Sequence, residues 1–270
     1  MKAIILAAGR GSRLGPQTDN RPKCLVTLGS KSLLSYQLDA LHTITQDIIV
    51  VRGYKADEIC VPGVRFVDNP DYATCNTVGS LMKARDEFVG DCLVCYSDLV
   101  YEPRLIQTLS AAHSSIGVAV DTSYEAYWKA RWGSTECDSE SLTIDSDGHI
   151  RGIGKPDPTP DEIHGRFIGL LSFDGAGSAA FKEVYDYHAK TYTARAGSWY
   201  AANSFDSAAM TDMCQAMIDF GIDITAVPVE RGWIEVDTLE DHRRYKQWIS
   251  DGRMQHFCRA FENRRADDLA

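Results

Sequence analysis

The first half of the chain alternates between short, continuously apolar segments and longer segments with helical spacing. The apolar segments, bounded mainly by Asp, Gly or Asn, span 2–6, 48–51, 64–67, 93–96 and 117–120. Such segments are typical of strands that are covered on both faces. The helical segments span 33–41, 78–88 and 105–112. Because strands that alternate with helices assemble into parallel sheets, this pattern predicts an α/β fold with a doubly wound, mostly parallel sheet.

After Asp121 the pattern changes. The segments 142–145 and 149–153 flank Asp147-Gly148 and predict a β-hairpin, since glycine adopts the positive φ of a tight turn. Further strands are predicted at 167–173 and 224–229, and helices at 179–191, 207–220 and 239–248. No repeat or low-complexity linker divides the chain. We therefore expect one domain over 1–250, made of the halves 1–121 and 122–250, followed by a C-terminal tail over 251–270.

Composition and charge exclude several classes of protein. Hydrophobic residues make up 44% and charged residues 24% of the chain, which indicates a folded globular protein and not a disordered one. No apolar run approaches the roughly 20 residues of a membrane span. The N-terminus also lacks the apolar segment of a secretory signal, so we expect a cytoplasmic protein with no membrane partner. A formal net charge of −10 argues against binding to nucleic acids, which requires an extended basic surface.

Positive charge is nevertheless concentrated near the N-terminus. Among the first 25 residues a single acid, Asp19, accompanies five basic residues: Lys2, Arg10, Arg13, Arg21 and Lys23. Glycines at positions 9 and 11 follow the first predicted strand, where the backbone N–H groups can approach a phosphate chain. The spacing matches neither a Walker A loop nor a complete G-x-G-x-x-G motif. From these residues alone, a phosphate-binding loop and a tight loop with solvated arginines are both open.

The stretch from Leu6 to Lys23 resembles a known family, the nucleotidyltransferases that activate phosphorylated sugars, choline or phosphonates with a nucleoside triphosphate. Their opening signature, L-A-A-G-x-G-x-R-L followed closely by R-P-K, is complete in this chain. The resemblance implies a Rossmann-like nucleotidyltransferase fold, with a nucleotide-binding half over 1–121 and an acceptor-binding half over 122–250 that adds a hairpin and helical lobe. It further implies that Arg13 and Lys23 stabilise charge on the phosphates during transfer. The loop expected to wrap the triphosphate comprises Leu6, Ala7, Ala8, Gly9, Arg10 and Gly11.

Two acidic positions resemble the metal-binding positions of the same family. Asp98 follows an apolar strand, and Asp237 lies in Glu235-Val-Asp237 near the end of the predicted domain. The resemblance implies that Asp98 and Asp237 together hold Mg²⁺, a hard ion that takes oxygen ligands. Taken alone, an Asp at the end of a strand is more often a helix cap or a turn residue.

Two further motifs extend the resemblance to the substrates. Ile153-Gly-Lys155-Pro156 resembles a second signature, in which the lysine holds the phosphate or phosphonate of the acceptor. Asn76 and Ser80, at the start of a predicted helix, match a segment that lies near the base and ribose of the nucleotide. Their alternative interpretation is a helix start with polar caps.

Later segments resemble one branch of the family, the phosphocholine and aminoethylphosphonate cytidylyltransferases. These segments span 138–142, 148–156, 168–173, 211–213, 227–229 and 232–237. Sugar-nucleotide members usually place Gly before the metal aspartate and Asn after it, whereas this chain has Ser97-Asp98-Leu99. The resemblance implies a magnesium-dependent cytidylyltransferase. It would transfer CMP from CTP to a small acceptor, such as aminoethylphosphonate, hydroxyethylphosphonate or a phosphocholine-like compound, and release pyrophosphate.

The sequence determines the head group of the acceptor less well than it determines the donor. A quaternary ammonium would require an aromatic cage, for which the aromatic stretch 124–132 offers Trp132, although this stretch can also be the packing face of a helix. A primary amine would require carboxylates, and Asp138 and Glu140 are the candidates. Three other functions stay open: a sugar-1-phosphate nucleotidylyltransferase, a non-catalytic nucleotide-sensing subunit and a glycosyltransferase with a related fold, although the last would normally carry a D-x-D motif where this chain has Asp98-Leu-Val. In each case we expect a monomer or a homodimer.

Overall fold

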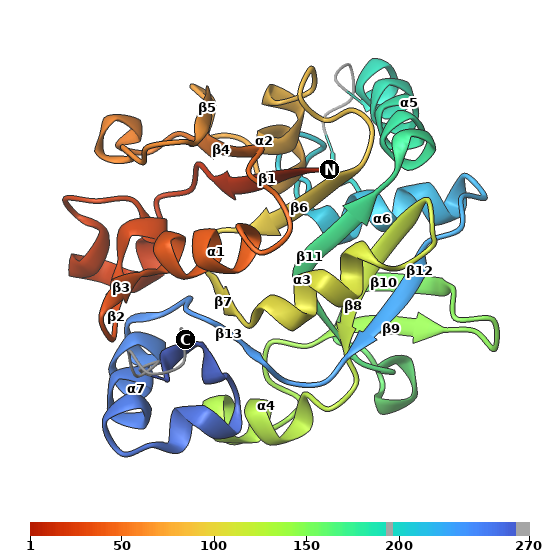
Figure 1. Ribbon diagram of the computed structural model, residues 1–270. Coiled ribbons are helices and arrows are strands. Elements are labelled where there is room, and N and C mark those ends of the chain that lie inside the picture. The colour runs from red at the N-terminus through yellow and green to blue at the C-terminus, as the bar shows by residue number, and fades with distance from the viewer. Residues whose placement is uncertain (193–196, 263–270) are drawn as a thin grey trace.

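A seven-stranded mixed sheet forms the centre of the computed structural model, which describes residues 1–192 and 197–262 (Figure 1). In spatial order its strands are β12 (Thr225–Val229), β8 (Ile116–Asp121), β11 (Arg166–Phe173), β6 (Cys92–Tyr96), β1 (Lys2–Ala7), β4 (Ile48–Arg52) and β5 (Arg65–Asp68). Adjacent strands are parallel except around β11, which runs antiparallel to both β6 and β8. The predicted α/β fold with a mostly parallel sheet is therefore confirmed, with β11 reversed.

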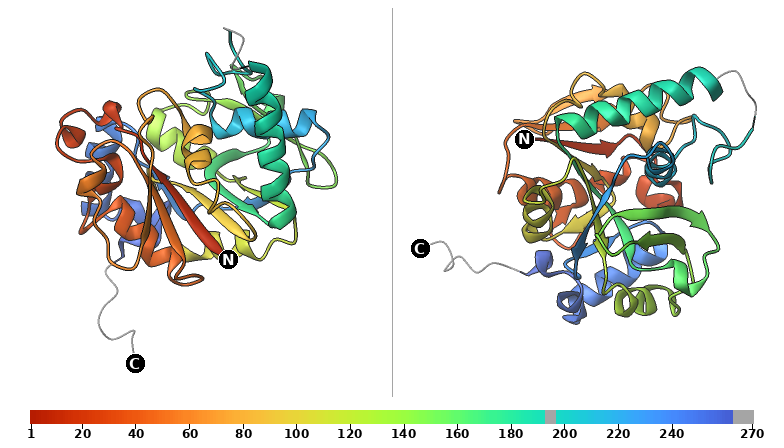
Figure 2. Two further views of the ribbon diagram at one scale, coloured as in Figure 1. Left: turned by 90° about the horizontal axis from the view of Figure 1, so that it is seen from above. Right: turned by 90° about the vertical axis from the view of Figure 1, so that its right-hand side faces the viewer.

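Both faces of the sheet are buried, because successive side chains of a strand point to opposite faces. Ile5 of β1 packs into the hydrophobic core that also contains residues of α1 (Leu33–Leu41) and α3 (Pro103–Ser110). The neighbouring Ile4 packs into the second core, with α2 (Thr77–Lys83), α5 (Gly175–Tyr192) and α6 (Met210–Asp219). Figure 2 shows helices on both sides of the sheet. This double burial explains why the strands are continuously apolar in the sequence.

The second half adds the predicted hairpin and an aromatic helix. Strands β9 (Glu140–Ile144) and β10 (Ile150–Pro156) pair antiparallel, and Gly148 in their connection has a φ of 85°. The hairpin packs against α6 through β10. The aromatic stretch forms α4 (Glu125–Trp132), in which Tyr127 and Trp128 are buried. The stretch 124–132, for which the sequence left open an aromatic cage or the packing face of a helix, thus forms a helix with buried aromatic side chains.

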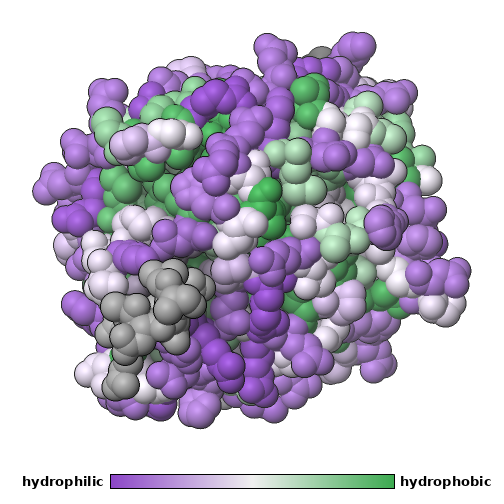
Figure 3. Space-filling model, in the orientation of Figure 1, coloured by the Kyte–Doolittle hydropathy of each residue, from purple (hydrophilic) through white to green (hydrophobic). Residues whose placement is uncertain are grey.

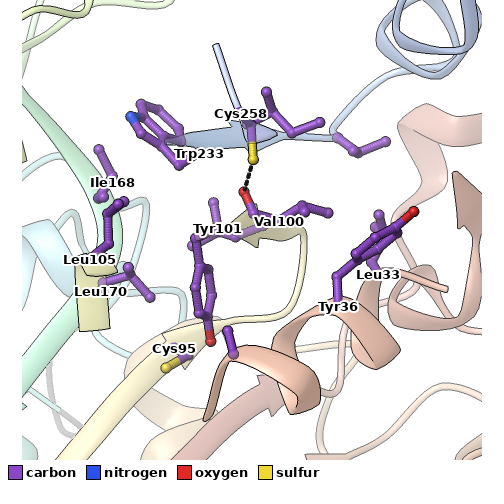
Figure 4. Packing of buried hydrophobic residues seen from close by; sticks show 14 of the residues in the cluster. Leu33, Tyr36, Cys95, Val100, Tyr101, Leu105, Ile168, Leu170, Trp233 and Cys258 are labelled. Atoms are coloured by element: carbon purple, nitrogen blue, oxygen red, sulfur yellow. Dashed lines mark hydrogen bonds between the residues drawn. The ribbon is translucent and has the colours of Figure 1, made fainter. Parts of the chain in front are cut away.

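The sequence did not predict two short pairs of strands. One joins β2 (Thr27–Leu28) and β3 (Lys31–Ser32), and the other joins β7 (Leu99–Tyr101) and β13 (Trp233–Glu235). From the sequence we expect only a turn at Gly232-Trp233, since three residues are too few to show a strand period. Figure 4 shows Val100 and Tyr101 of β7 and Trp233 of β13 within one buried hydrophobic cluster. The pairing of β7 with β13 thus links residues near 100 with residues near 234.

The segment after β13 packs onto the same core. Helix α7 (Leu239–Ser250) is followed, in the described residues, by two short 3-10 helices, and both lie in the expected tail. Met254 and Cys258 are buried there, and Figure 4 shows the Cys258 sulfur beside the Val100 carbonyl oxygen, at 3.9 Å. The packed part of the chain therefore extends beyond residue 250, while 263–270 lie outside the described residues. The six 3-10 helices of the described ranges are Ser12–Thr18, Lys23–Leu25, Ala56–Glu58, Pro160–Glu162, Arg253–His256 and Arg259–Phe261.

One face of the molecule shows mainly polar side chains at its surface (Figure 3). On the face seen in Figure 3, hydrophilic residues border the patches of hydrophobic residues. Within the described ranges, no helix has both the length and the apolar character needed to cross a membrane.

Candidate active site

The loop after β1 brings Lys23 close to its glycines. Gly11 has a φ of 70°, and a Cβ atom at this position would lie 2.8 Å from side-chain carbons of Lys23. Only glycine therefore lets the lysine pass at this distance without a shift. The Thr18 hydroxyl donates a hydrogen bond to the Gly11 carbonyl oxygen at 3.2 Å and anchors the loop. Gly11 thus has a second role beyond exposing backbone N–H groups: it makes room for Lys23.

Three carboxylates meet just beyond the end of β6. Oxygen atoms of Asp98, Glu235 and Asp237 lie within 4.8 Å of one another. The pairing of β7 with β13 produces this carboxylate cluster, because the Val236 N–H donates to the Asp98 carbonyl oxygen at 2.9 Å. The structure therefore brings together the two aspartates that the resemblance paired. Glu235 joins them as a third carboxylate that our predicted ligand pair did not include, although its spacing from Asp237 in Glu-Val-Asp was a visible signal.

Lys23 lies between the two aspartates. Its Nζ atom is 2.7 Å from Asp98 Oδ2 and 2.6 Å from Asp237 Oδ1, and its side chain is 10% exposed. Burial acts to lower the pKa of Lys23, but the negative charges of Asp98 and Asp237 outweigh it, so the pKa is raised and the ammonium stays charged. Arg13 contacts Asp237 at 2.5 Å from the solvent side, with its own side chain 64% exposed. The predicted catalytic cations Arg13 and Lys23 thus both contact the carboxylate cluster.

The carboxylate cluster has the chemistry of a magnesium site. Its three residues offer only oxygen donors, which Mg²⁺ prefers. Asp98 Oδ1 is buried and has no hydrogen-bond partner among the described residues, and such an atom is normally satisfied by a water or an ion. Burial raises the pKa of Glu235; Arg131 opposes this rise, and the charges of Asp98 and Asp237 add to it. A divalent cation would relieve that repulsion, so these residues fit Mg²⁺.

A cavity of about 230 Å³ opens beside the carboxylate cluster. Arg13, Glu235 and Asp237 form part of its wall. The rest of the wall comes from α4, the β9–β10 hairpin, β11 and their neighbours. It includes Tyr96, Leu99, Trp128, Asp138, Glu140, Ser141, Leu142, Ile153, Gly165, Arg166, Phe167, Ile168, Gly169, Ala209, Thr211 and Trp233. The cavity therefore connects the candidate metal site with the acceptor half predicted from the sequence.

Negative charge is available to a ligand in this cavity, whereas Arg166 is engaged by the protein. Glu140 lines the cavity and its side chain is exposed, yet partial loss of water around its carboxyl group raises its pKa to about 7. Asp138 adds to this rise, and the positive charge of Arg166 opposes it. The buried Arg166 donates to the carbonyl oxygens of Asp138 and Thr135, each at 3.0 Å, and its guanidinium lies 4.6 Å from the ring centre of Trp128. Arg166 therefore offsets part of the negative charge of Asp138 and Glu140, and the remainder is available to a head group.

Other predicted site residues make different contacts. Lys155, expected to hold the acceptor, is 60% exposed, pairs with Glu162 at 2.8 Å and is not part of the cavity wall. Trp132 is also absent from the wall, and the Arg131 guanidinium lies 4.8 Å from the centre of the Trp132 ring. The tryptophan of α4 that lines the cavity is Trp128. The structure therefore does not bring Lys155 or Trp132 together with the carboxylate cluster.

Asn76 and Ser80 make contacts of the kind expected at a helix start. The Asn76 side chain accepts a hydrogen bond from the Thr77 N–H at 2.8 Å at the beginning of α2. The Ser80 hydroxyl is buried and accepts a hydrogen bond from the Asn69 amide at 3.1 Å. These contacts agree with the polar-capped helix that the sequence left open as the alternative to nucleotide binding.

Comparison with known proteins adds independent information. Residues 3–157 match the MobA-like NTP transferase domain family. The CTP:phosphoglutamine cytidylyltransferase of Campylobacter jejuni is 31% identical over 89% of this chain and 97% of its own length. The choline-phosphate cytidylyltransferase of Streptococcus pneumoniae is 26% identical over 93% of this chain and 99% of its own. A solved structure of the CTP:phosphocholine cytidylyltransferase from Streptococcus pneumoniae superposes with a TM-score of 0.70 at 23% identity, covering 92% of this chain and 98% of that chain, and so has the same fold.

Proposed function

The chain belongs to the MobA-like NTP transferase family and is a nucleotidyltransferase, and from this premise we propose that it transfers CMP from CTP to a small phosphate or phosphonate acceptor and releases pyrophosphate. The observation that carries the proposal is the carboxylate cluster, with Lys23 and Arg13 in contact with it, beside a small cavity. Both full-length relatives are named as cytidylyltransferases, which supports CTP as the donor. A non-catalytic nucleotide-sensing subunit would not need this assembled set of charges.

The proposed reaction requires charge neutralisation more than acid–base chemistry. An oxygen of the acceptor forms a bond to the α-phosphorus of CTP as the bond from that phosphorus to the bridging oxygen breaks, and pyrophosphate leaves with that oxygen. Because the acceptor oxygen is already anionic at neutral pH, no general base is needed, and positioning dominates. Lys23 and Arg13 supply positive charge beside the phosphates. When bound by Asp98, Glu235 and Asp237, Mg²⁺ would add charge neutralisation and orient phosphate oxygens.

The loop after β1 is the proposed site of the triphosphate. The backbone N–H groups of residues 9–11 follow β1 directly, and the exposed Arg10 and Arg13 lie on the same segment. Anions bind where several N–H groups converge near positive charge. This arrangement would hold the phosphates of CTP next to Lys23 and the carboxylate cluster.

We expect CTP to be a better donor than ATP, GTP or UTP. The expectation rests on the relatives' names and on the similarity of residues 232–237 to the cytidylyltransferase branch. Pyrophosphate release measured with each triphosphate, Mg²⁺ and a panel of small phosphates and phosphonates gives kcat/KM for every pair. A preference for UTP or deoxythymidine triphosphate, with hexose 1-phosphates as acceptors, would instead place the protein with the sugar-1-phosphate enzymes.

We further propose that the acceptor carries a positively charged head group. Glu140 and Asp138 lie in the cavity, and Arg166 of the same wall, which donates hydrogen bonds to backbone carbonyls, offsets only part of their negative charge, because the pKa of Glu140 is still raised. The aromatic side chains of Tyr96, Trp128 and Phe167 line the same cavity, and aromatic faces attract cations. A neutral head group, as in hydroxyethylphosphonate or a sugar, would add no counter-charge to the one that Arg166 provides. The cavity, which holds these groups together with Glu235 and Asp237, has a volume of about 230 Å³ and so suits a small molecule.

The proposal predicts a pH dependence for acceptor binding. Since Glu140 has a pKa raised to about 7, its carboxyl group is neutral below that pH and charged above it. The KM for a cationic acceptor such as aminoethylphosphonate should therefore fall as the pH rises from 6 to 8. In Glu140→Gln the KM should be roughly tenfold higher at pH 8, the loss of one charged hydrogen bond, and should change less with pH.

Two comparisons isolate this effect. Glu162→Gln alters an acid of the same lobe that pairs with Lys155 and is not in the cavity wall, so its profile should match that of the unaltered protein. Hydroxyethylphosphonate, which lacks an amine, should show no dependence on Glu140. Equal KM values for aminoethylphosphonate in Glu140→Gln and the unaltered protein would remove Glu140 from the acceptor site.

A further inference from the structure

Arg131 is a buried cation whose contacts lead to the carboxylate cluster. Its side chain, in α4, is 0% exposed. Nε and Nη2 donate to the two carboxylate oxygens of Asp241, both at 2.9 Å, and Nη1 donates to Glu235 Oε2 at 2.6 Å. A guanidinium is stable without water only when carboxylates pair with it, and its planar fork fixes the direction of each partner. Arg131 therefore constrains the side chain of Glu235 directly.

Asp241 extends this constraint to Asp237. The Asp241 Oδ2 atom that pairs with Arg131 also accepts hydrogen bonds from the backbone N–H groups of Asp237 at 3.1 Å and Thr238 at 2.9 Å. The Thr238 hydroxyl in turn accepts from the Asp241 N–H at 3.0 Å, which closes a capping box at the start of α7. Through one carboxylate, Arg131 is thus connected to the backbone that presents Asp237.

Helix α4 also holds the backbone of Glu235. Tyr127 lies one helical turn before Arg131, so both side chains leave the same face of the helix. The Tyr127 hydroxyl accepts a hydrogen bond from the Glu235 N–H at 3.0 Å and is 2.6 Å from the hydroxyl of Tyr245. The backbone and the side chain of Glu235 are therefore each fixed by α4.

We propose that Arg131 is a positioning residue for the metal site: it holds Glu235, and through Asp241 the backbone of Asp237, in the arrangement that binds a divalent cation. Three carboxylates within 4.8 Å repel one another, and a fixed positive charge behind them opposes their separation. Arg131 makes this contact from the side of α4, whereas Lys23 and Arg13 contact Asp237 from the loop after β1. The inference rests on the proposed magnesium site, but it requires neither CTP nor the acceptor.

The test measures binding of Mn²⁺ alone, by electron paramagnetic resonance of the free ion, to Arg131→Lys. Lysine keeps the charge, but its single ammonium cannot reproduce the fork that reaches two carboxylates. We expect Mn²⁺ to bind at least about tenfold more weakly, the usual effect of removing a partner of a metal ligand. Circular dichroism should show a folded protein. Lys129→Ala, which removes an exposed lysine of the same helix that pairs with Glu125, should leave Mn²⁺ binding unchanged.

A second set of variants separates positioning from general packing. In a Glu235→Gln background, Arg131→Lys should weaken Mn²⁺ binding less than it does in the unaltered chain, because part of its effect passes through Glu235. An equal loss in both backgrounds would overturn the inference, and so would unchanged Mn²⁺ affinity in folded Arg131→Lys. If Arg131→Lys does not fold, Asp241→Asn tests the same contacts from the other side, and unchanged affinity there overturns the inference as well.

The outcome for the unaltered protein distinguishes this inference from the proposed function. If the unaltered protein binds no Mn²⁺, or if Asp98→Asn leaves its Mn²⁺ affinity unchanged, the metal site itself is overturned, and the role of Arg131 with it. If Mn²⁺ binding depends on Asp98 but not on Arg131, only the positioning role fails.

Discussion

Replacing either Asp98 or Asp237 by asparagine is expected to abolish nucleotidyl transfer and to leave the fold intact. The amide has nearly the shape of the carboxylate but lacks its charge, and a hard divalent cation binds charged oxygen ligands far better than amides. We expect the rate of pyrophosphate release to fall by about a thousandfold or more, because charge neutralisation at the phosphates is the main catalytic contribution in this site. Folding should persist because Lys23 contacts both aspartates, so either variant leaves it one carboxylate partner.

Three measurements make this prediction specific. Chelation of Mg²⁺ should stop the unaltered protein to a similar extent. Binding of the triphosphate should largely survive in both variants, since the loop after β1 is unchanged. Asp39→Asn removes an exposed carboxylate that pairs with Lys31, outside the cavity wall, and should keep full activity. More than a tenth of the original activity in Asp98→Asn would contradict the metal assignment.

Replacing Lys23 by methionine is expected to have the second-largest effect, on both turnover and stability. Turnover should fall at least about a hundredfold because the ammonium neutralises charge that grows in the transition state. In the absence of Mg²⁺ the substitution leaves Asp98 and Asp237 without their shared buried partner, which should cost about 3 kcal/mol of unfolding free energy. Mg²⁺ should restore most of this stability if it binds the same carboxylates, as we propose. Thermal unfolding with chelator and with Mg²⁺, beside pyrophosphate release, measures both effects.

Arg13 and Lys31 provide matched comparisons for Lys23. Arg13→Ala should also lower turnover about a hundredfold, but its side chain is 64% exposed, so unfolding should change little. Lys31→Met removes an exposed lysine that pairs with Asp39 and should change neither quantity. If Lys23→Met stayed within tenfold of the original turnover, Lys23 would be a structural counter-ion for the carboxylate cluster and not a catalytic residue.

The alternation of apolar and helical segments was sufficient to predict the architecture. Strands such as β1 and β6 are covered on both faces, so consecutive residues of each strand are apolar and the strand can be recognised in the sequence. Asp147-Gly148 likewise indicates the turn of the hairpin. The reversal of β11 was not predictable, because an apolar strand carries the same pattern in either direction. Resemblance to a known family, and not periodicity, selected Lys23, Asp98 and Asp237 from among the many charged residues of the chain.

By itself, the sequence determined which segments are buried, where the loop that we propose for phosphate binding lies and which family its motifs resemble, since each of these depends on residues close together in the chain. Only the tertiary structure decided which distant side chains meet. The pairing of β7 with β13, too short to show a period, places Glu235 beside Asp98, and α4 brings Arg131 behind it. The same long-range packing leaves Lys155 with Glu162 outside the cavity wall. Local sequence specifies burial and backbone conformation, whereas contacts between segments about a hundred residues apart depend on how sheet, hairpin and helices pack together.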